Sequence, residues 1–165
     1  MKFVREMGPL AITVALFGGV IAVLLRDGNV LGTWLLAAFL VGHGWVHAMY
    51  VMPRPAPAVA TAKGPAWPFE LDHSWLLSPL GVPAPTLRLI GAVLAAGTIA
   101  GYGVAALATI PLVVPAAAWA ALVVASTVAS LGLMGLFFHR NLLIGFAIDA
   151  VLLAVALTSV WLPAV

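Results

Sequence analysis

Five long apolar segments constrain what this chain can fold into. They cover residues 9–25, 30–52, 87–110, 115–138 and 142–162. Each can cross about 30 Å of hydrocarbon at about 1.5 Å per helical residue, once short ends and tilt are allowed for. The whole chain is 64% hydrophobic and only 7% charged, with a mean hydropathy of +1.19, unlike soluble domains. The sequence therefore predicts an all-α, polytopic membrane helix bundle of five transmembrane helices.

Three of the four connections between these segments are short. Residues 26–29 form a charged turn, 111–115 a turn bracketed by prolines, and 139–141 a polar turn. Short connections join antiparallel neighbours, so segments one and two, three and four, and four and five are expected to form hairpins. No polar stretch is long enough to bury a core of its own. We therefore expect residues 1–165 to be a single transmembrane domain.

The basic residues predict the topology. If every segment spans the membrane, one side receives six of the seven: Lys2, Arg5, Arg54, Lys63, Arg88 and Arg140. Only Arg26 falls on the other side. By the positive-inside rule the N-terminus is cytoplasmic and the C-terminus is outside. The first segment lacks a small-x-small cleavage pattern, so we interpret it as a retained span.

The long connection, residues 53–86, has two parts. Its first part, Pro53 to Pro57, alternates proline with other residues and is expected to be extended and mobile. The second part, 65–77, mixes Trp, Phe and Leu with Glu70, Asp72 and His73. It is interpreted either as a segment lying along the cytoplasmic interface, with one or two helical turns, or as an ordinary solvated loop.

Two histidines, His43 and His47, lie four residues apart inside the apolar second segment. Because a helix turns every 3.6 residues, both rings face the same way, at a depth where polar groups are costly. With the predicted topology they lie roughly 13 and 8 Å from the cytoplasmic end of the segment. Asp149 lies roughly 11 Å from the same side in the fifth segment, so it matches the two rings in height.

An aspartate at the centre of a membrane helix costs about 3 kcal/mol, so Asp149 is expected to face the bundle interior. Gly145, one turn earlier, would let the second helix approach. His43, His47 and Asp149 would then form a ligand set suited to Zn, Fe, Mn or Cu, with His139 or His73 completing it. The leading hypothesis is thus a transition-metal site in the inner leaflet.

Other interpretations of the same residues stay open. The cluster could be only a hydrogen-bond network between helices, in an accessory or scaffolding subunit of a membrane complex. It could also handle a proton or a substrate, as in a proton-coupled permease. Haem b ligated by His43 and His139 is a weaker hypothesis, because the two rings differ in depth.

Several function classes are excluded or disfavoured. The chain has no cysteine, which removes thiolate sites and disulfides. It has no phosphate-binding glycine loop, so ATP binding is not expected, and the scattered basic residues make no nucleic-acid surface. No hydrolase motif is present, and no catalytic residue is predicted. The expected partners are the lipid bilayer and either a membrane-protein partner or a second copy of the chain.

Small and hydroxyl residues predict how the helices pack. In the third segment, Gly97 and Gly101 form a small-xxx-small step, which we assign to packing within the chain. In the fourth, Ser126, Thr127 and Ser130 are expected to donate to backbone carbonyls four residues back.

The run Gly42-His43-Gly44-Trp45-Val46-His47, with the late Gly145-Phe146-Ala147-Ile148-Asp149, resembles a group of small bacterial membrane proteins with a His-Gly-x-x-His signature. The resemblance implies a multi-pass protein of the bacterial cytoplasmic membrane with a shared inner-leaflet site. It implies no particular activity.

Overall fold

A computed structural model describes residues 2–52, 68–110 and 113–158. Its five long helices are α1 Lys2–Arg26, α2 Val30–Val46, α3 Ala84–Thr109, α4 Trp119–Leu136 and α5 Leu143–Thr158. Short 3₁₀ turns extend α2 (η1, His47–Tyr50), precede α3 (η2, Ser78–Leu80), α4 (η3, Ala116–Ala118) and α5 (η4, Arg140–Leu142). With these turns, five helical segments are long and apolar enough to cross a membrane. The predicted all-α class and the presence of five helices of membrane-spanning length are confirmed, so the chain is a multi-pass membrane protein by length and composition.

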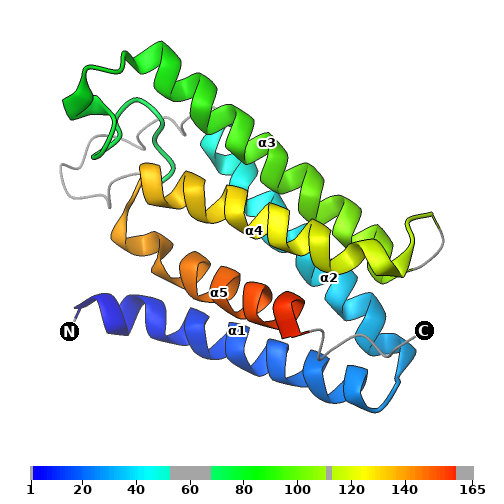
Figure 1. The fold of residues 1–165 in the computed structure, drawn as a ribbon. Helices are drawn as coiled ribbons and strands as arrows, with labels where there is room; N and C mark the ends of the chain where they lie inside the picture. Colours follow the sequence, from blue (N-terminus) through cyan, green and yellow to red (C-terminus); the bar gives the residue numbers. More distant parts are fainter. Residues whose placement is uncertain (1, 53–67, 111–112, 159–165) are drawn as a thin grey trace.

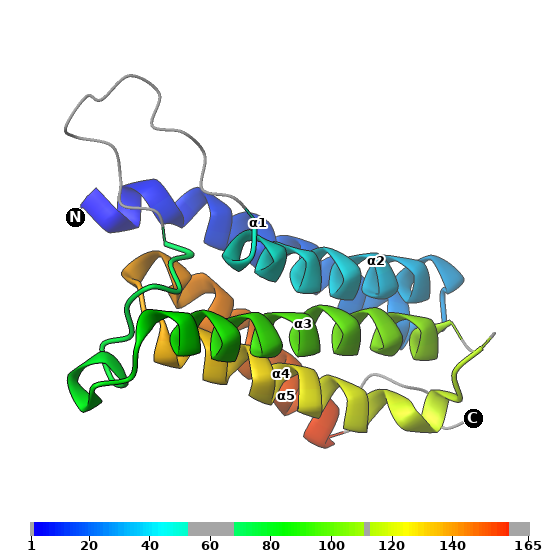
Figure 2. The same cartoon turned by 90° about the horizontal axis from the view of Figure 1, so that it is seen from above.

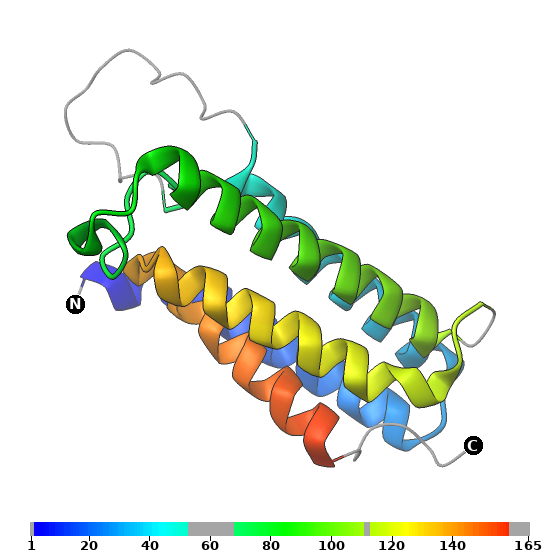
Figure 3. The same cartoon turned by 45° about the horizontal axis from the view of Figure 1, so that its top comes forward.

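The helices run along one long axis, as Figures 1 and 2 show. Neighbours in the chain pack together as predicted: α1 on α2, α3 on α4 and α4 on α5. In addition, α3 packs against α2, although the longest connection of the chain joins these two helices. Figure 3 shows α3 and α4 side by side along most of their length.

The α1–α2 turn forms where the sequence placed it. Gly28 adopts a positive φ of 66°, which glycine accepts without strain. The side chain of Asn29 then caps α2 by accepting a hydrogen bond from the Leu31 backbone N–H at 2.9 Å. A Cβ at Gly32 would lie 2.8 Å from the backbone nitrogen of Leu25, so this glycine lets the two helices close tightly.

Residues 68–80, which we call the strap, cross the end of the bundle where α4 finishes and α5 begins. Ser74 Oγ donates to the Leu136 carbonyl, and Trp75 Nε1 donates to the Gly135 carbonyl, each at 2.6 Å. These bonds satisfy carbonyls that the last turn of α4 leaves without helical partners. The strap is therefore packed onto the bundle and is not a freely solvated loop.

Apolar and ionic contacts also hold the strap to α3. Leu71 is buried and fills the space left by the missing side chain of Gly91, where a Cβ would overlap its methyl groups. Asp72 forms an exposed ion pair with Arg88 in the first turns of α3. Only one helical turn, η2, lies in the described part of this connection. The stretch Pro53–Pro57, like the final residues of the fifth predicted span, lies outside the described residues.

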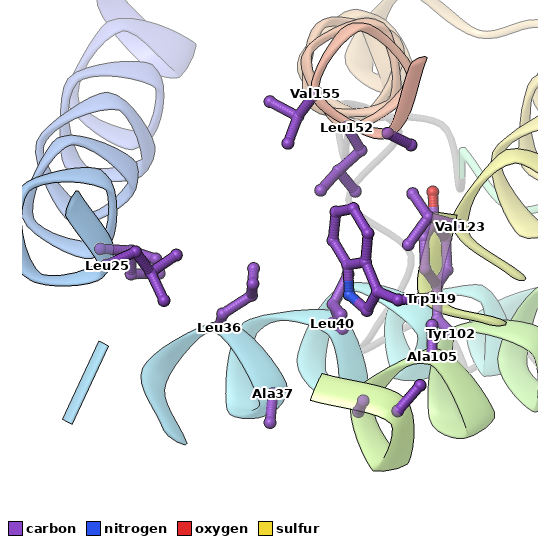
Figure 4. Close-up of a cluster of buried hydrophobic side chains, with 14 residues drawn as sticks. Leu25, Leu36, Ala37, Leu40, Tyr102, Ala105, Trp119, Val123, Leu152 and Val155 are labelled. Carbon is purple, nitrogen blue, oxygen red and sulfur yellow. The ribbon is translucent and has the colours of Figure 1, made fainter. Parts of the chain in front are cut away.

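The apolar core has two parts. The larger lies at the middle and far end of the bundle around Trp119, which is 1% exposed and packs with Leu40, Val123 and Leu152 (Figure 4). The smaller lies beneath the strap; its buried members are Tyr50, Leu71, Leu87, Ala95, Leu133, Met134, Phe137 and Leu142. The polar groups of the candidate site lie on α2–α5 and η1, the same elements that contribute apolar residues to these two core regions.

Two packing predictions need correction. Gly101 does pack within the chain, because a Cβ there would overlap the hydroxyl of Ser126 on α4. Gly97 faces open space, however, so only one glycine of the predicted pair makes a helix contact. Gly145 admits α4 and not α2: its added Cβ would lie 2.8 Å from the sulfur of Met134. Gly44 lets α2 approach α3, where it faces Tyr102.

Candidate functional site: a buried hydrogen-bond network

The two histidines occupy the last turn of α2 and the start of η1. Their ring centroids are 5.5 Å apart and the rings are nearly perpendicular, at 85°. His43 is 9% exposed and His47 is 3% exposed, so both face the interior. The prediction that one helical face carries both rings is confirmed.

Asp149 on α5 is completely buried and meets His43. Its Oδ1 atom lies 2.8 Å from Nε2 of His43 and accepts a second hydrogen bond, also 2.8 Å long, from the hydroxyl of Tyr102. Its other oxygen, Oδ2, has no hydrogen-bond partner among the described residues. The predicted inward orientation of Asp149 is therefore correct, and its carboxyl group is satisfied on one side only.

His47 uses both ring nitrogens. Nδ1 lies 3.1 Å from the carbonyl oxygen of His43, which can only accept, so Nδ1 carries the hydrogen. Nε2 lies 2.7 Å from Oγ of Ser130 on α4. In the neutral ring Nε2 therefore accepts from the serine hydroxyl, and a metal ion at this atom would have to displace that bond.

Tyr102 completes the network, although nothing in the sequence marks it as part of a site. It is fully buried on α3, and its ring packs edge-on against His43 with centroids 5.2 Å apart. Because its single hydroxyl hydrogen goes to Asp149, the contact of 2.9 Å with Thr127 Oγ1 must be donated by the threonine. The described groups thus join α2, α3, α4 and α5 through one set of polar contacts.

The prediction that the α4 hydroxyl groups donate to backbone carbonyls four residues back is correct for only one of the three residues. Ser126 does donate to a backbone carbonyl four residues back, that of Leu122, at 2.6 Å. Thr127 and Ser130 instead bond to Tyr102 and His47. The sequence carried a signal for this, because positions 126, 127 and 130 fall on one side of a helix.

The remaining predicted ligands lie elsewhere. His139 caps η4, where its Nδ1 accepts a hydrogen bond of 3.2 Å from the backbone N–H of Asn141. His73 is exposed in the strap. Over residues 2–52, 68–110 and 113–158, no three His, Asp or Glu side chains form a group able to hold a metal ion. The predicted ligands His43, His47, Asp149, His139 and His73 thus form no such metal-binding group in that part of the chain.

The chemistry of the network follows from charge and burial. Moving a carboxylate away from water is costly unless donors surround it, and Asp149 has donors on only one oxygen. Burial penalises charge on both Asp149 and His43. The ion pair and the neutral acid–imidazole pair, which contain the same number of protons, are therefore closer in energy than they are in water.

Comparisons with known proteins add no family. No protein-family model, no curated protein and no solved structure matches this chain.

Proposed function

We propose that this membrane protein takes up and releases a proton at the His43–Asp149 pair, as proton-coupled permeases do within their spans. The observation that carries the proposal is the half-satisfied carboxyl group of Asp149, which is fully buried and bonded through Oδ1 alone. Ionisable residues at this depth are costly and commonly belong to ion or proton pathways. A purely structural carboxylate would be expected to have partners on both oxygens.

Protonation of the pair would act on helix packing. Asp149 connects α5 to α2 through His43 and to α3 through Tyr102. A proton on either side of the pair changes which atoms donate and which accept, so it alters the bonds that hold three helices together. This supports a role in which proton binding is coupled to a small movement of α5 against α2 and α3.

We infer that the strap end of the bundle faces the cytoplasm of a bacterial cell. Six of the seven Lys and Arg residues lie at this end or in the connection leading to the strap, when the chain is followed through the five helices. The positive-inside rule supports this orientation. It places the His43–Asp149 pair in the inner half of the bilayer.

The test is an infrared pH titration of the protein in liposomes. A protonated carboxyl group has a C=O band that the carboxylate lacks, and the difference between wild type and Asp149→Asn isolates this group from the other four acidic residues. We expect the Asp149 band to change within the pH range over which the protein stays folded. His43→Gln removes the hydrogen-bond partner of Asp149 Oδ1 and should change the pH at which the band appears.

The matched control is Asp27→Asn, in the exposed turn between α1 and α2, which should leave the Asp149 band unchanged. A band that stays constant across this range would instead support the accessory-subunit interpretation, in which the network only ties α2–α5 together. Near-stoichiometric metal in protein purified without a His tag, lost in His43→Ala, would overturn the proton proposal in favour of the metal site.

A further inference from the structure

An apolar cavity of about 410 Å³ lies between α1, α2 and α5. Every residue along its lining is apolar or glycine, and the α1 side runs from Ala11 to Ala22. Figure 4 shows Leu36 of α2 and Leu152 of α5, two lining residues, pointing into the space between these helices. Apolar cavities of about 150 Å³ stay dry and bind small hydrocarbons, so water is not the expected occupant here.

The face of α1 toward this cavity carries several small residues, and two of them, Gly18 and Gly19, have open space beside them. Cβ atoms added at Gly18 and Gly19 would meet nothing within 4 Å. Small residues usually let membrane helices approach closely, as Gly32 does in the same hairpin. Here they leave space, and this space is continuous with the lipid-facing surface formed by exposed residues such as Val151.

The cavity follows α1 for about three turns. Its α1 lining lies within the twelve helical residues from Ala11 to Ala22, which extend over about 17 Å. Because this space is continuous with the lipid-facing surface, the hydrocarbon chains of the bilayer can enter it. A hydrocarbon chain is about 4 Å thick, the contact distance between carbon atoms, and it fits.

We propose that the cavity between α1, α2 and α5 holds one acyl chain of a bilayer lipid. Phe39 lines the cavity and stacks on His43 with an interplanar angle of 5° and a centroid distance of 6.1 Å. The chain therefore lies one aromatic ring away from the His43–Asp149 pair. This inference goes beyond the proposed proton function and does not depend on it.

The experiment uses the full chain in liposomes that contain a phospholipid with a photoactivatable group in mid-chain, and it maps cross-links by mass spectrometry. We expect cross-links at Phe39 and Ile148 to exceed those at Leu89 and Val93 on the lipid-facing side of α3 at least fivefold. Gly18→Leu fills the cavity and should reduce the cross-links at Phe39 and Ile148 to the level of the surface residues. If that variant does not fold, Ala15→Leu fills the same space.

The matched control is Gly97→Leu, because Gly97 is also an open glycine of a membrane-facing surface but lies on α3. It should leave the labelling of Phe39 and Ile148 unchanged. The chain has no cysteine, so Val151→Cys introduces a single thiol. A disulfide between two chains would then show that a second copy lies against this cavity. Equal labelling of cavity and surface, unchanged labelling in Gly18→Leu, or a covalent dimer of Val151→Cys under oxidation would each overturn the acyl-chain site. None of these outcomes bears on the titration of Asp149.

Discussion

Replacing Asp149 by alanine is expected to destabilise the folded bundle by about 1–3 kcal/mol. The variant removes the shared acceptor of His43 Nε2 and the Tyr102 hydroxyl and leaves both donors buried without that partner. An unsatisfied buried donor costs about 1–3 kcal/mol in soluble proteins, whereas single hydrogen bonds between membrane helices average about 0.6 kcal/mol. Two bonds of about 0.6 kcal/mol each give a lower limit of about 1 kcal/mol, and one fully unsatisfied donor gives an upper limit of about 3 kcal/mol.

The measurement is reversible unfolding in bicelles or mixed micelles, with Asp27→Ala as the matched control. Asp27 is exposed in the α1–α2 turn, so its loss should change the free energy of unfolding by less than about 0.5 kcal/mol. Asp149→Asn keeps an acceptor oxygen and should fall between wild type and Asp149→Ala. Equal stability of Asp149→Ala and Asp27→Ala would show that the network contributes nothing to the fold.

A leucine in place of Gly44 is expected to separate α2 from α3. A Cβ at this position would already lie 3.0 Å from the Cβ of Tyr102 and 3.6 Å from backbone atoms of Ile99, so a branched side chain has no room. Overpacking of this kind costs about 1–3 kcal/mol. Movement of Tyr102 would also break its bond to Asp149, so we expect a lower free energy of unfolding together with a displaced Asp149 titration.

Gly42→Leu gives a closely matched comparison on the same helix. Gly42 is exposed, and a Cβ there would meet nothing within 4 Å, so leucine should be accommodated against lipid. Unfolding and the infrared titration can be measured on both variants. If Gly44→Leu were as stable as Gly42→Leu, the close contact of α2 and α3 at Tyr102 would not be needed to build the site.

The spans could be predicted because length and hydropathy are properties of the sequence alone. The contact between His43 and Asp149 could be predicted too, because both are costly in lipid and the hairpin order places them at one height. The rotation of each helix could not be predicted in the same way. Spans that are apolar on all sides carry no strong periodic signal, so the pattern does not tell which side faces which neighbour.

The unknown rotation of the helices explains why the partner of Gly145 was predicted wrongly and why Tyr102 was not predicted. Gly145 is flanked by apolar residues, and nothing local distinguishes a partner on α4 from one on α2. Tyr102 is a large and mostly apolar side chain in an apolar span, so its hydroxyl group becomes informative only when Asp149 is seen beside it. Thr127 and Ser130 had a local alternative in backbone carbonyls, and tertiary partners took precedence.

The protonation of the His43 ring nitrogens shows most directly whether the His43–Asp149 pair takes up and releases a proton. Nitrogen-15 solid-state NMR of histidine-labelled protein in bilayers distinguishes protonated from unprotonated ring nitrogens. If His43 and Asp149 share a proton, the His43 signals should change with pH together with the Asp149 carboxyl band and should shift in Asp149→Asn, while exposed His73 is the same in both proteins. Identical His43 signals in wild type and Asp149→Asn at every pH would contradict the account.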